Sequence, residues 1–125
     1  MRADRSPDGP LQGLQVVEIA STIAGPACAR LLADFGAEVI KIEPPEGDPV
    51  RQMGRHVASE QGDVSLYAAS ILRNKRSVVL DLKHPADRAT VRALIARADI
   101  LVENFRPGVM ERLGMDYDTL AQDNP

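Results

Sequence analysis

The sequence predicts an α/β fold, a Rossmann-like parallel sheet with flanking helices. Two observations predict it. The chain contains short apolar runs of strand length, and it also contains longer stretches whose apolar residues recur at helical spacing. These two kinds of segment alternate along the sequence. Such alternation of strands and helices is typical of a parallel, doubly wound sheet. At 125 residues the chain is long enough for one domain with a real core.

The first predicted unit is a strand, a helix and a second strand. Gln15 to Ile19 is a short apolar run of strand length. Gly25-Pro26 opens a helical pattern, because proline suits the first helical position, and Gly36 stands where a C-terminal cap belongs. Cys28 falls on the apolar spacing of this helix and is expected to be a small core residue. Glu38 to Glu43 is the second strand, and the crossover between the strands should be right-handed.

The rest of the chain continues the alternation. The stretch 44–62 begins with a Pro- and Gly-rich run and is expected to be a loop. The elements predicted after it are a helix over 64–72, a third strand over 77–82, a helix over 84–97, a fourth strand over 99–103, a short helix near Met110 and a last helix over 118–122.

Composition excludes several classes of function. A formal charge of −3 and an aromatic content of 3% argue against nucleic-acid binding. No apolar run approaches the length of a membrane span, and residues 1–10 read as a disordered tail rather than a signal peptide. Cys28 is the only cysteine, so we expect no internal disulfide and a cytoplasmic location. Neither histidine pairs with other ligands at metal-binding spacing, so no metal is expected.

Anion-holding groups follow two of the predicted strands. Lys83 comes at the end of the third strand, and Asn104-Phe105-Arg106 follows the fourth. In an open α/β sheet, ligands bind in the crevice beyond the carboxyl ends of the strands. Both sets of donors should therefore face one crevice, which predicts a phosphate-bearing small molecule. The basic residues of 73–76 lie at the other end of their strand and are expected to be structural or peripheral.

A series of short motifs runs through the chain from Leu11 onward. They are Leu11-Gln12-Gly13-Leu14, Ala24-Gly25-Pro26-Ala27, Leu32 to Glu43, Gly47-Asp48 with Arg51, Asn74-Lys75-Arg76-Ser77, Asp81-Leu82-Lys83, Glu103 to Gly108 and Glu111-Arg112-Leu113-Gly114. Each motif alone is weak, but their order and spacing over about nine tenths of the chain are specific. Together they resemble the amino-terminal part of a family III CoA-transferase, a family that includes formyl-CoA transferase, carnitine CoA-transferase and α-methylacyl-CoA racemase.

The resemblance implies a site for coenzyme A, bound as its acyl thioester. The residues that match the family's CoA-binding positions are Ile23, Ala24, Leu80, Asp81, Leu82, Lys83, Asn104, Phe105, Arg106 and, less closely, Arg112. The family passes CoA to a carboxylic acid through covalent intermediates on an aspartate. That aspartate lies beyond the matched segment, so no catalytic residue is assigned in this chain. The resemblance also implies an interlocked homodimer for the full-length protein.

Two positions depart from the family pattern. Ile23 stands where formyl-CoA transferase has a glutamine, which predicts a more apolar or bulkier acyl group than formate or oxalate. Pro44 stands where several members have an arginine that contacts CoA. Arg51 and Arg55 are the candidates to replace that arginine.

Three functions remain open at this point. The chain is expected to be a fragment of a CoA-transferase, with the last strand left at an unpaired edge of the sheet. It could equally be the same portion of an acyl-CoA racemase, whose catalytic histidine and aspartate would also lie outside it. The third alternative is a truncated module without activity. The downstream sequence separates the first two, and a CoA-binding measurement tests the third.

Overall fold

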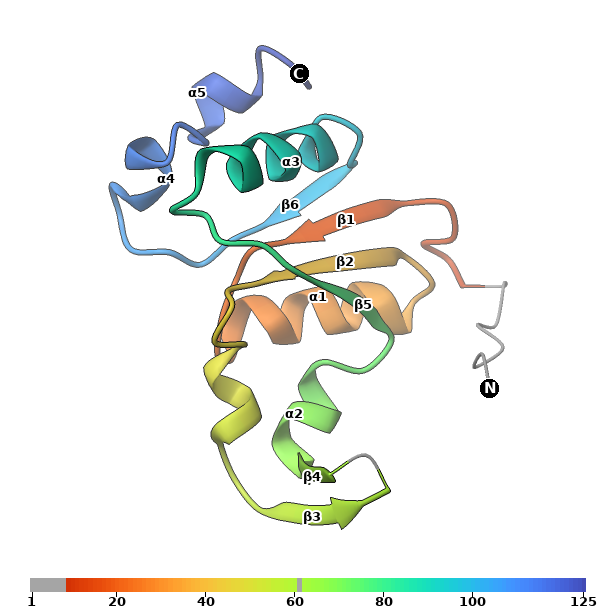
Figure 1. The fold of residues 1–125 in the computed structure, drawn as a ribbon. Coiled ribbons are helices and arrows are strands. Elements are labelled where there is room, and N and C mark those ends of the chain that lie inside the picture. The colour runs from red at the N-terminus through yellow and green to blue at the C-terminus, as the bar shows by residue number, and fades with distance from the viewer. Residues whose placement is uncertain (1–8, 61) are drawn as a thin grey trace.

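A four-stranded parallel sheet forms the centre of the molecule. The computed structural model describes residues 9–60 and 62–125. The strands β1 (Gln15–Glu18), β2 (Glu38–Glu43), β5 (Lys75–Val79) and β6 (Ile100–Val102) are arranged in the order β5-β2-β1-β6. All three pairings are parallel, so the carboxyl ends of the strands lie at one edge, on the left in Figure 1. The predicted α/β fold is confirmed.

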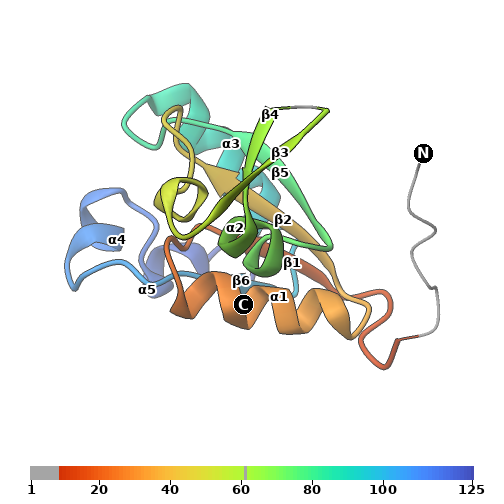
Figure 2. The same ribbon diagram turned by 90° about the horizontal axis from the view of Figure 1, so that it is seen from below.

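Two helices cover opposite faces of the sheet. Helix α1 (Ala24–Asp34) crosses from β1 to β2 on the rear face, and α3 (Pro85–Ile95) crosses from β5 to β6 on the front face (Figures 1 and 2). Successive side chains of each strand point to opposite faces of the sheet. Val16 and Val39 pack with α1, whereas Val17 and Ile42 pack with α3.

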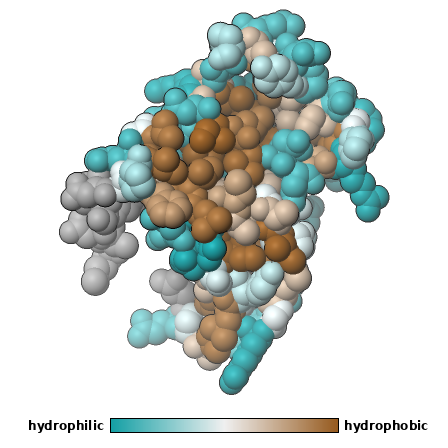
Figure 3. Space-filling model, turned by 180° about the vertical axis from the view of Figure 1, so that it is seen from behind, coloured by the Kyte–Doolittle hydropathy of each residue, from teal (hydrophilic) through white to brown (hydrophobic). Residues whose placement is uncertain are grey.

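Small residues form the face of α1 that packs on the sheet. The buried residues of this helix are Gly25, Pro26, Ala29 and Ala33. The prediction that Cys28 is a core residue is wrong, because its side chain is exposed. Large apolar residues of the same helix point outward, with Leu31 48% exposed and Phe35, just after its end, 53% exposed. Figure 3 shows apolar side chains gathered on this rear side of the molecule.

The segment expected to be a loop contains regular structure. It holds a 3-10 helix, η1 (Pro49–Gln52), and most of an antiparallel hairpin of β3 (His56–Ser59) and β4 (Gly62–Ser65). The following helix, α2, begins at Leu66 and not at Val64 as predicted. Ser65 sets this start, because its hydroxyl oxygen accepts the Ala68 N–H at 3.1 Å as an N-cap.

The third strand ends earlier than predicted. β5 runs from Lys75 to Val79, so Lys83 lies four residues beyond the strand rather than at its end. Residues 80–84 instead form a connection that crosses the carboxyl edge of the sheet to the start of α3 (Figure 1). Residues 80–83, which are predicted to bind the ligand, therefore lie mostly in a turn after the strand and not in the strand itself.

The chain closes with two short helices, α4 (Val109–Arg112) and α5 (Tyr117–Leu120). Among the described residues, β6 pairs only with β1 and has a free edge. An open groove of about 720 Å³ runs along this edge, between β6 and the helices α4 and α5. Residues 1–8 of the predicted tail lie outside the described residues, whereas the Gly9 carbonyl accepts the Gln12 N–H at 3.0 Å. Within the described part of the chain, no helix has the length and apolarity to cross a membrane.

Candidate functional site

Connections from four strands meet at the carboxyl edge of the sheet. They are the β1–α1 turn, the segment after β2, the crossing segment 80–84 and the loop 103–108 between β6 and α4. β5 and β6 lie at opposite sides of the sheet, and the crossing segment leads from the end of β5 to the start of α3 (Figure 1). Most of the predicted site residues therefore lie at one edge.

The crossing segment is held by its own turn. Asp81 Oδ1 accepts the Lys83 N–H at 2.9 Å, and the Asp81 N–H donates to Asp87 Oδ2 at 2.8 Å. The Leu80 N–H donates to the Glu43 carbonyl at 3.0 Å, which anchors the segment to β2. Asp81 therefore shapes the turn, while the Lys83 side chain is exposed at the edge.

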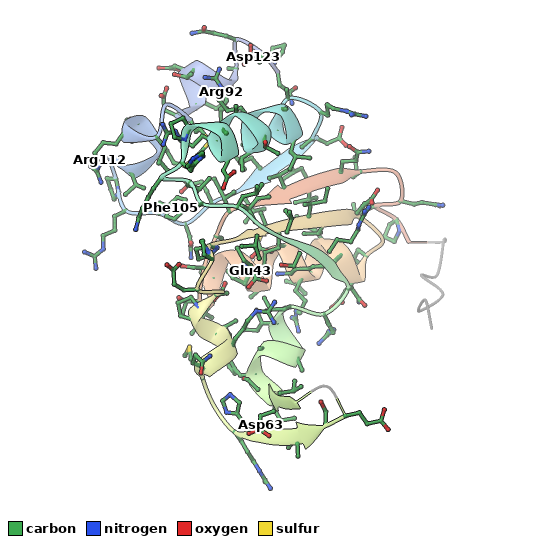
Figure 4. All side chains as sticks on the ribbon, viewed as in Figure 1. Glu43, Asp63, Arg92, Phe105, Arg112 and Asp123 are labelled. Carbon is green, nitrogen blue, oxygen red and sulfur yellow. The ribbon has the colours of Figure 1, made fainter. Side chains whose placement is uncertain are left out.

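The loop after β6 and the crossing segment both contribute to one apolar cluster. Phe105, Leu80 and Leu82 are half-buried and pack on this cluster, and we call these three side chains the apolar floor of the site. Figure 4 labels Phe105 on the loop between β6 and α4. Arg106 follows as an exposed side chain, and Arg112 is exposed on α4. Each of the two segments thus carries apolar side chains on one cluster and an exposed cation next to them in sequence.

Asn104 binds the backbone of the β1–α1 turn. Its Oδ1 accepts the Ser21 N–H at 3.0 Å, and its Nδ2 donates to the Ser21 carbonyl at 2.9 Å. The amide group is therefore engaged by the β1–α1 turn, because both ends of it bind the same residue. Asn104 links two of the connections at the edge.

Ile23 and Ala24 form the exposed tip of that turn. Ile23 is 46% exposed, and Ala24 begins α1. Gly25 follows at a point of close approach: a Cβ there would overlap the Ala20 Cβ and lie 3.4 Å from Asn104 Cγ. The glycine therefore lets the start of α1 sit directly against β1 and the loop after β6.

The basic residues of 73–76 divide into two groups. Arg73 binds Asp34, and Arg76 binds Glu38, so their predicted structural role is confirmed. Lys75 is different, since its side chain is only 2% exposed. Burial, the largest influence, lowers the pKa of Lys75 below its usual value, against the opposing effect of Glu18.

Arg51 does not offer a free guanidinium to replace the arginine missing at Pro44. Its Nε and Nη2 donate to the two oxygens of Glu43 in a bidentate pair. Ser77 and the Asp48 N–H also donate to Glu43. Arg55, the other candidate, is exposed on the segment before β3.

The sequence interpretation missed a buried charge cluster beside the site, which consists of Glu18, Lys41, Asp48 and Lys75. These side chains are 0% to 2% exposed. Lys41 Nζ lies 2.8 Å from both Glu18 Oε1 and Asp48 Oδ2, and Lys75 Nζ lies 2.7 Å from Glu18 Oε2. A signal was available, because charged residues in strands that are buried on both faces must be paired.

The edge has the side chains to hold an anion. Exposed cations and an apolar floor suit a phosphate-bearing ligand with a flat or aliphatic part. Over residues 9–60 and 62–125, no group of three or more His, Cys, Asp or Glu residues could hold a metal ion. The groove along β6 shares residues 105–108 with the site but excludes Lys83 and Ile23, so it is a neighbouring feature.

Known proteins with similar sequences are CoA-transferases. An acetyl-CoA:oxalate CoA-transferase of Acetobacter aceti is 48% identical over 120 residues, which are 95% of this chain and 30% of that protein. A succinyl-CoA–D-citramalate CoA-transferase of Chloroflexus aurantiacus is 43% identical over 124 residues, 98% of this chain and 30% of that protein. The chain thus spans about 30% of the length of these relatives.

Solved structures agree with this result. A crystal structure of a CaiB/BaiF family protein from Brucella suis superposes with a TM-score of 0.89 and 41% identity, over 94% of this chain and 32% of that one. The model of CoA-transferase family III matches residues 11–125. The chain belongs to CoA-transferase family III and corresponds to the amino-terminal portion of its members.

Proposed function

We propose that this chain is the CoA-binding, amino-terminal part of an enzyme that moves CoA from an acyl-CoA thioester to a carboxylic acid. The observation that carries the proposal is that the crossing segment 80–83 and the loop 104–106 both follow carboxyl ends of parallel strands and pack side chains on one apolar cluster. It occurs in a chain whose family members transfer CoA.

The exposed cations and the apolar floor have separate roles in this proposal. Arg106, Lys83 and the more distant Arg112 are the exposed groups available to the CoA phosphates. Leu80, Leu82 and Phe105 supply apolar contact for the adenine or the pantetheine arm. Asp81 shapes the turn, and Asn104 joins the loop after β6 to Ser21 of the β1–α1 turn.

The turn tip at Ile23 and Ala24 lies beside the thioester in this proposal. Its side chains are exposed and apolar, which favours an acyl group with an apolar part. The similar proteins are named for small acids, oxalate and citramalate, which differ from that expectation. Binding of acetyl-CoA, succinyl-CoA and a longer aliphatic acyl-CoA distinguishes an apolar acyl group from a small acidic one. The exposed Ile23 predicts that the aliphatic acyl-CoA binds more tightly.

The covalent steps belong to the part of the protein that this chain does not cover. An aspartate carboxylate there would attack the thioester and pass CoA to the acceptor acid, which divides one difficult transfer into easier steps. A homodimer and a cytoplasmic location are part of the same proposal. The relatives described above are transferases, which favours CoA transfer over racemisation.

Binding of CoA and dephospho-CoA to the purified chain tests the proposal. Arg106→Ala should weaken CoA binding by about 1.5–3 kcal/mol, the scale of a hydrogen bond to a charged group, or roughly ten- to hundredfold in Kd. Arg97→Ala is the matched control, because Arg97 is an exposed arginine just before the amino end of β6.

Isothermal titration calorimetry gives both affinities for each variant. The control should leave CoA binding unchanged. Equal affinities of wild type and Arg106→Ala for CoA would remove this arginine from the phosphate site, and absence of binding by the wild-type chain would refute the proposal for this chain.

A further inference from the structure

The buried charge cluster is placed to do more than join strands. Its members come from β1, β2, β5 and the segment after β2, on the face of the sheet that carries α1. Two ammonium and two carboxylate groups there are shielded from water. Buried ion pairs contribute little net stability, because desolvation offsets their attraction. Stability alone is therefore a poor explanation for four charges at this place.

Each lysine of the cluster also donates to a backbone carbonyl at one end of the β1–α1 turn. Lys41 Nζ donates to the Ala20 carbonyl at 2.8 Å, where the chain leaves β1. Lys75 Nζ donates to the Pro26 carbonyl at 2.7 Å, in the first turn of α1. The two ammonium groups thus hold the beginning and the end of the turn.

Asp48 holds the middle of the same turn. Its Oδ1 accepts the Thr22 N–H at 3.1 Å and the Val50 N–H at 2.9 Å. Its Oδ2 faces Lys41 as an ion pair and makes no hydrogen bond among the described residues. Thr22 has φ 68°, a left-handed conformation that is costly for a β-branched residue and persists only where its surroundings enforce it.

We propose that this cluster is a positioning device for the β1–α1 turn, with Asp48 and Lys41 as positioning residues that act through Thr22 and Ala20. The device fixes the exposed tip, Ile23 and Ala24, relative to the loop 104–106, to which Asn104 also joins the turn. The selection of the acyl group therefore depends on charged residues that never touch the ligand. This inference rests on the proposed function, which places the tip beside the thioester.

The first test follows the turn without any ligand. Asp48→Ala removes the acceptor of the Thr22 N–H. Ser65→Ala is the matched control, because Ser65 is another buried polar residue that hydrogen-bonds backbone groups, but those of η1 and α2 and not of the turn. Amide hydrogen exchange is measured by NMR at Thr22, with the Val39 amide of the central strand β2 as the reference for global opening.

In Asp48→Ala, exchange at Thr22 should rise by about tenfold or more relative to Val39, as expected for the loss of one hydrogen bond to a charged acceptor. Ser65→Ala should leave this ratio near its wild-type value. If Thr22 and Val39 accelerate together in Asp48→Ala, the cluster stabilises the whole fold and the positioning role is refuted.

The second test asks what the positioned turn does for the ligand. In Asp48→Ala the ratio of acetyl-CoA affinity to free CoA affinity should change by at least about threefold, which corresponds to about 0.7 kcal/mol, with CoA itself bound as in the wild type. An unchanged ratio despite a released Thr22 amide would refute the role in acyl selection. Failure of the wild-type chain to bind either molecule refutes the proposed function and the acyl role, while the exchange measurement still decides whether the cluster positions the turn.

Discussion

The Glu43 carboxylate offers a quantitative test of the electrostatics around the candidate site. Its side chain is 3% exposed and accepts hydrogen bonds from Arg51, Ser77 and the Asp48 N–H. Burial alone would raise the pKa of Glu43, but these donors outweigh it and hold the pKa at about 2, below the ordinary value of 4.5. Glu43→Gln keeps the size of the side chain and removes its charge.

The magnitude follows from the difference between the two pKa values. A drop from 4.5 to about 2 corresponds to about 3 kcal/mol of stabilisation by the ionised form. Because the pKa in the folded chain is the lower one, this stability is fully present above pH 4.5. It is lost as the pH falls from 4.5 through about 2, where the folded chain finally binds the proton that the unfolded chain already holds.

Urea unfolding of the wild type and of Glu43→Gln at several pH values between 2 and 7 measures the effect. The difference in free energy of unfolding between the two chains should be largest at neutral pH and shrink steadily between pH 4.5 and about 2. Arg76→Gln is the control, because it removes an exposed pair with Glu38 and should change the acid limb little. A difference that stays constant with pH would show that Glu43 is not ionised in the folded chain with a lowered pKa.

Three further predictions concern other parts of the molecule. Gly25→Ala should lower the free energy of unfolding by about 1–3 kcal/mol in urea titrations, because the added Cβ overlaps Ala20; a neutral effect would contradict the close packing at the start of α1. Cys28 should react with a thiol reagent in the native chain at nearly the rate seen in denaturant, since it is exposed; strong protection would contradict the orientation of α1. The isolated chain should give no product in assays with acetyl-CoA and oxalate, and turnover by highly purified chain would place a nucleophile within it.

The sheet was accessible to sequence reasoning because its strands have a simple pattern. Glu38 to Glu43 is bounded by glycine on one side and prolines on the other, and the observed strand has the predicted limits. The third strand was placed too late, because Leu80 and Leu82 continue the apolar run although the chain has already left the sheet. Apolar content alone does not distinguish a strand from a packed turn.

The orientation of α1 could not be read from periodicity. Apolar residues occupy most positions of this helix, so several faces are equally apolar. The face on the sheet consists of Ala29, Ala33 and Gly25, since only small side chains allow the close approach. The large residues Leu31 and Phe35 face outward, against the usual expectation.

The contacts at the candidate site depend on residues distant in sequence. The motifs indicated which segments follow the carboxyl ends of the strands, but they did not show that Asn104 binds Ser21, 83 positions away, or that Arg51 binds Glu43. Charged residues within β1 and β2 were the missed signal. Lys41 and Glu18 can be buried only as partners, and this requirement predicts a cluster before any coordinates are known.

NMR titration of the chain with CoA, followed through the backbone amide shifts, measures directly whether CoA binds at the carboxyl edge of the sheet. We expect saturable shifts to concentrate at residues 80–83 and 104–106 and at the β1–α1 turn, with smaller shifts near Arg106 when dephospho-CoA replaces CoA. Shifts confined to the amino edge of the sheet, around residues 13–15 and 96–99, or no saturable shifts at all, would contradict this expectation.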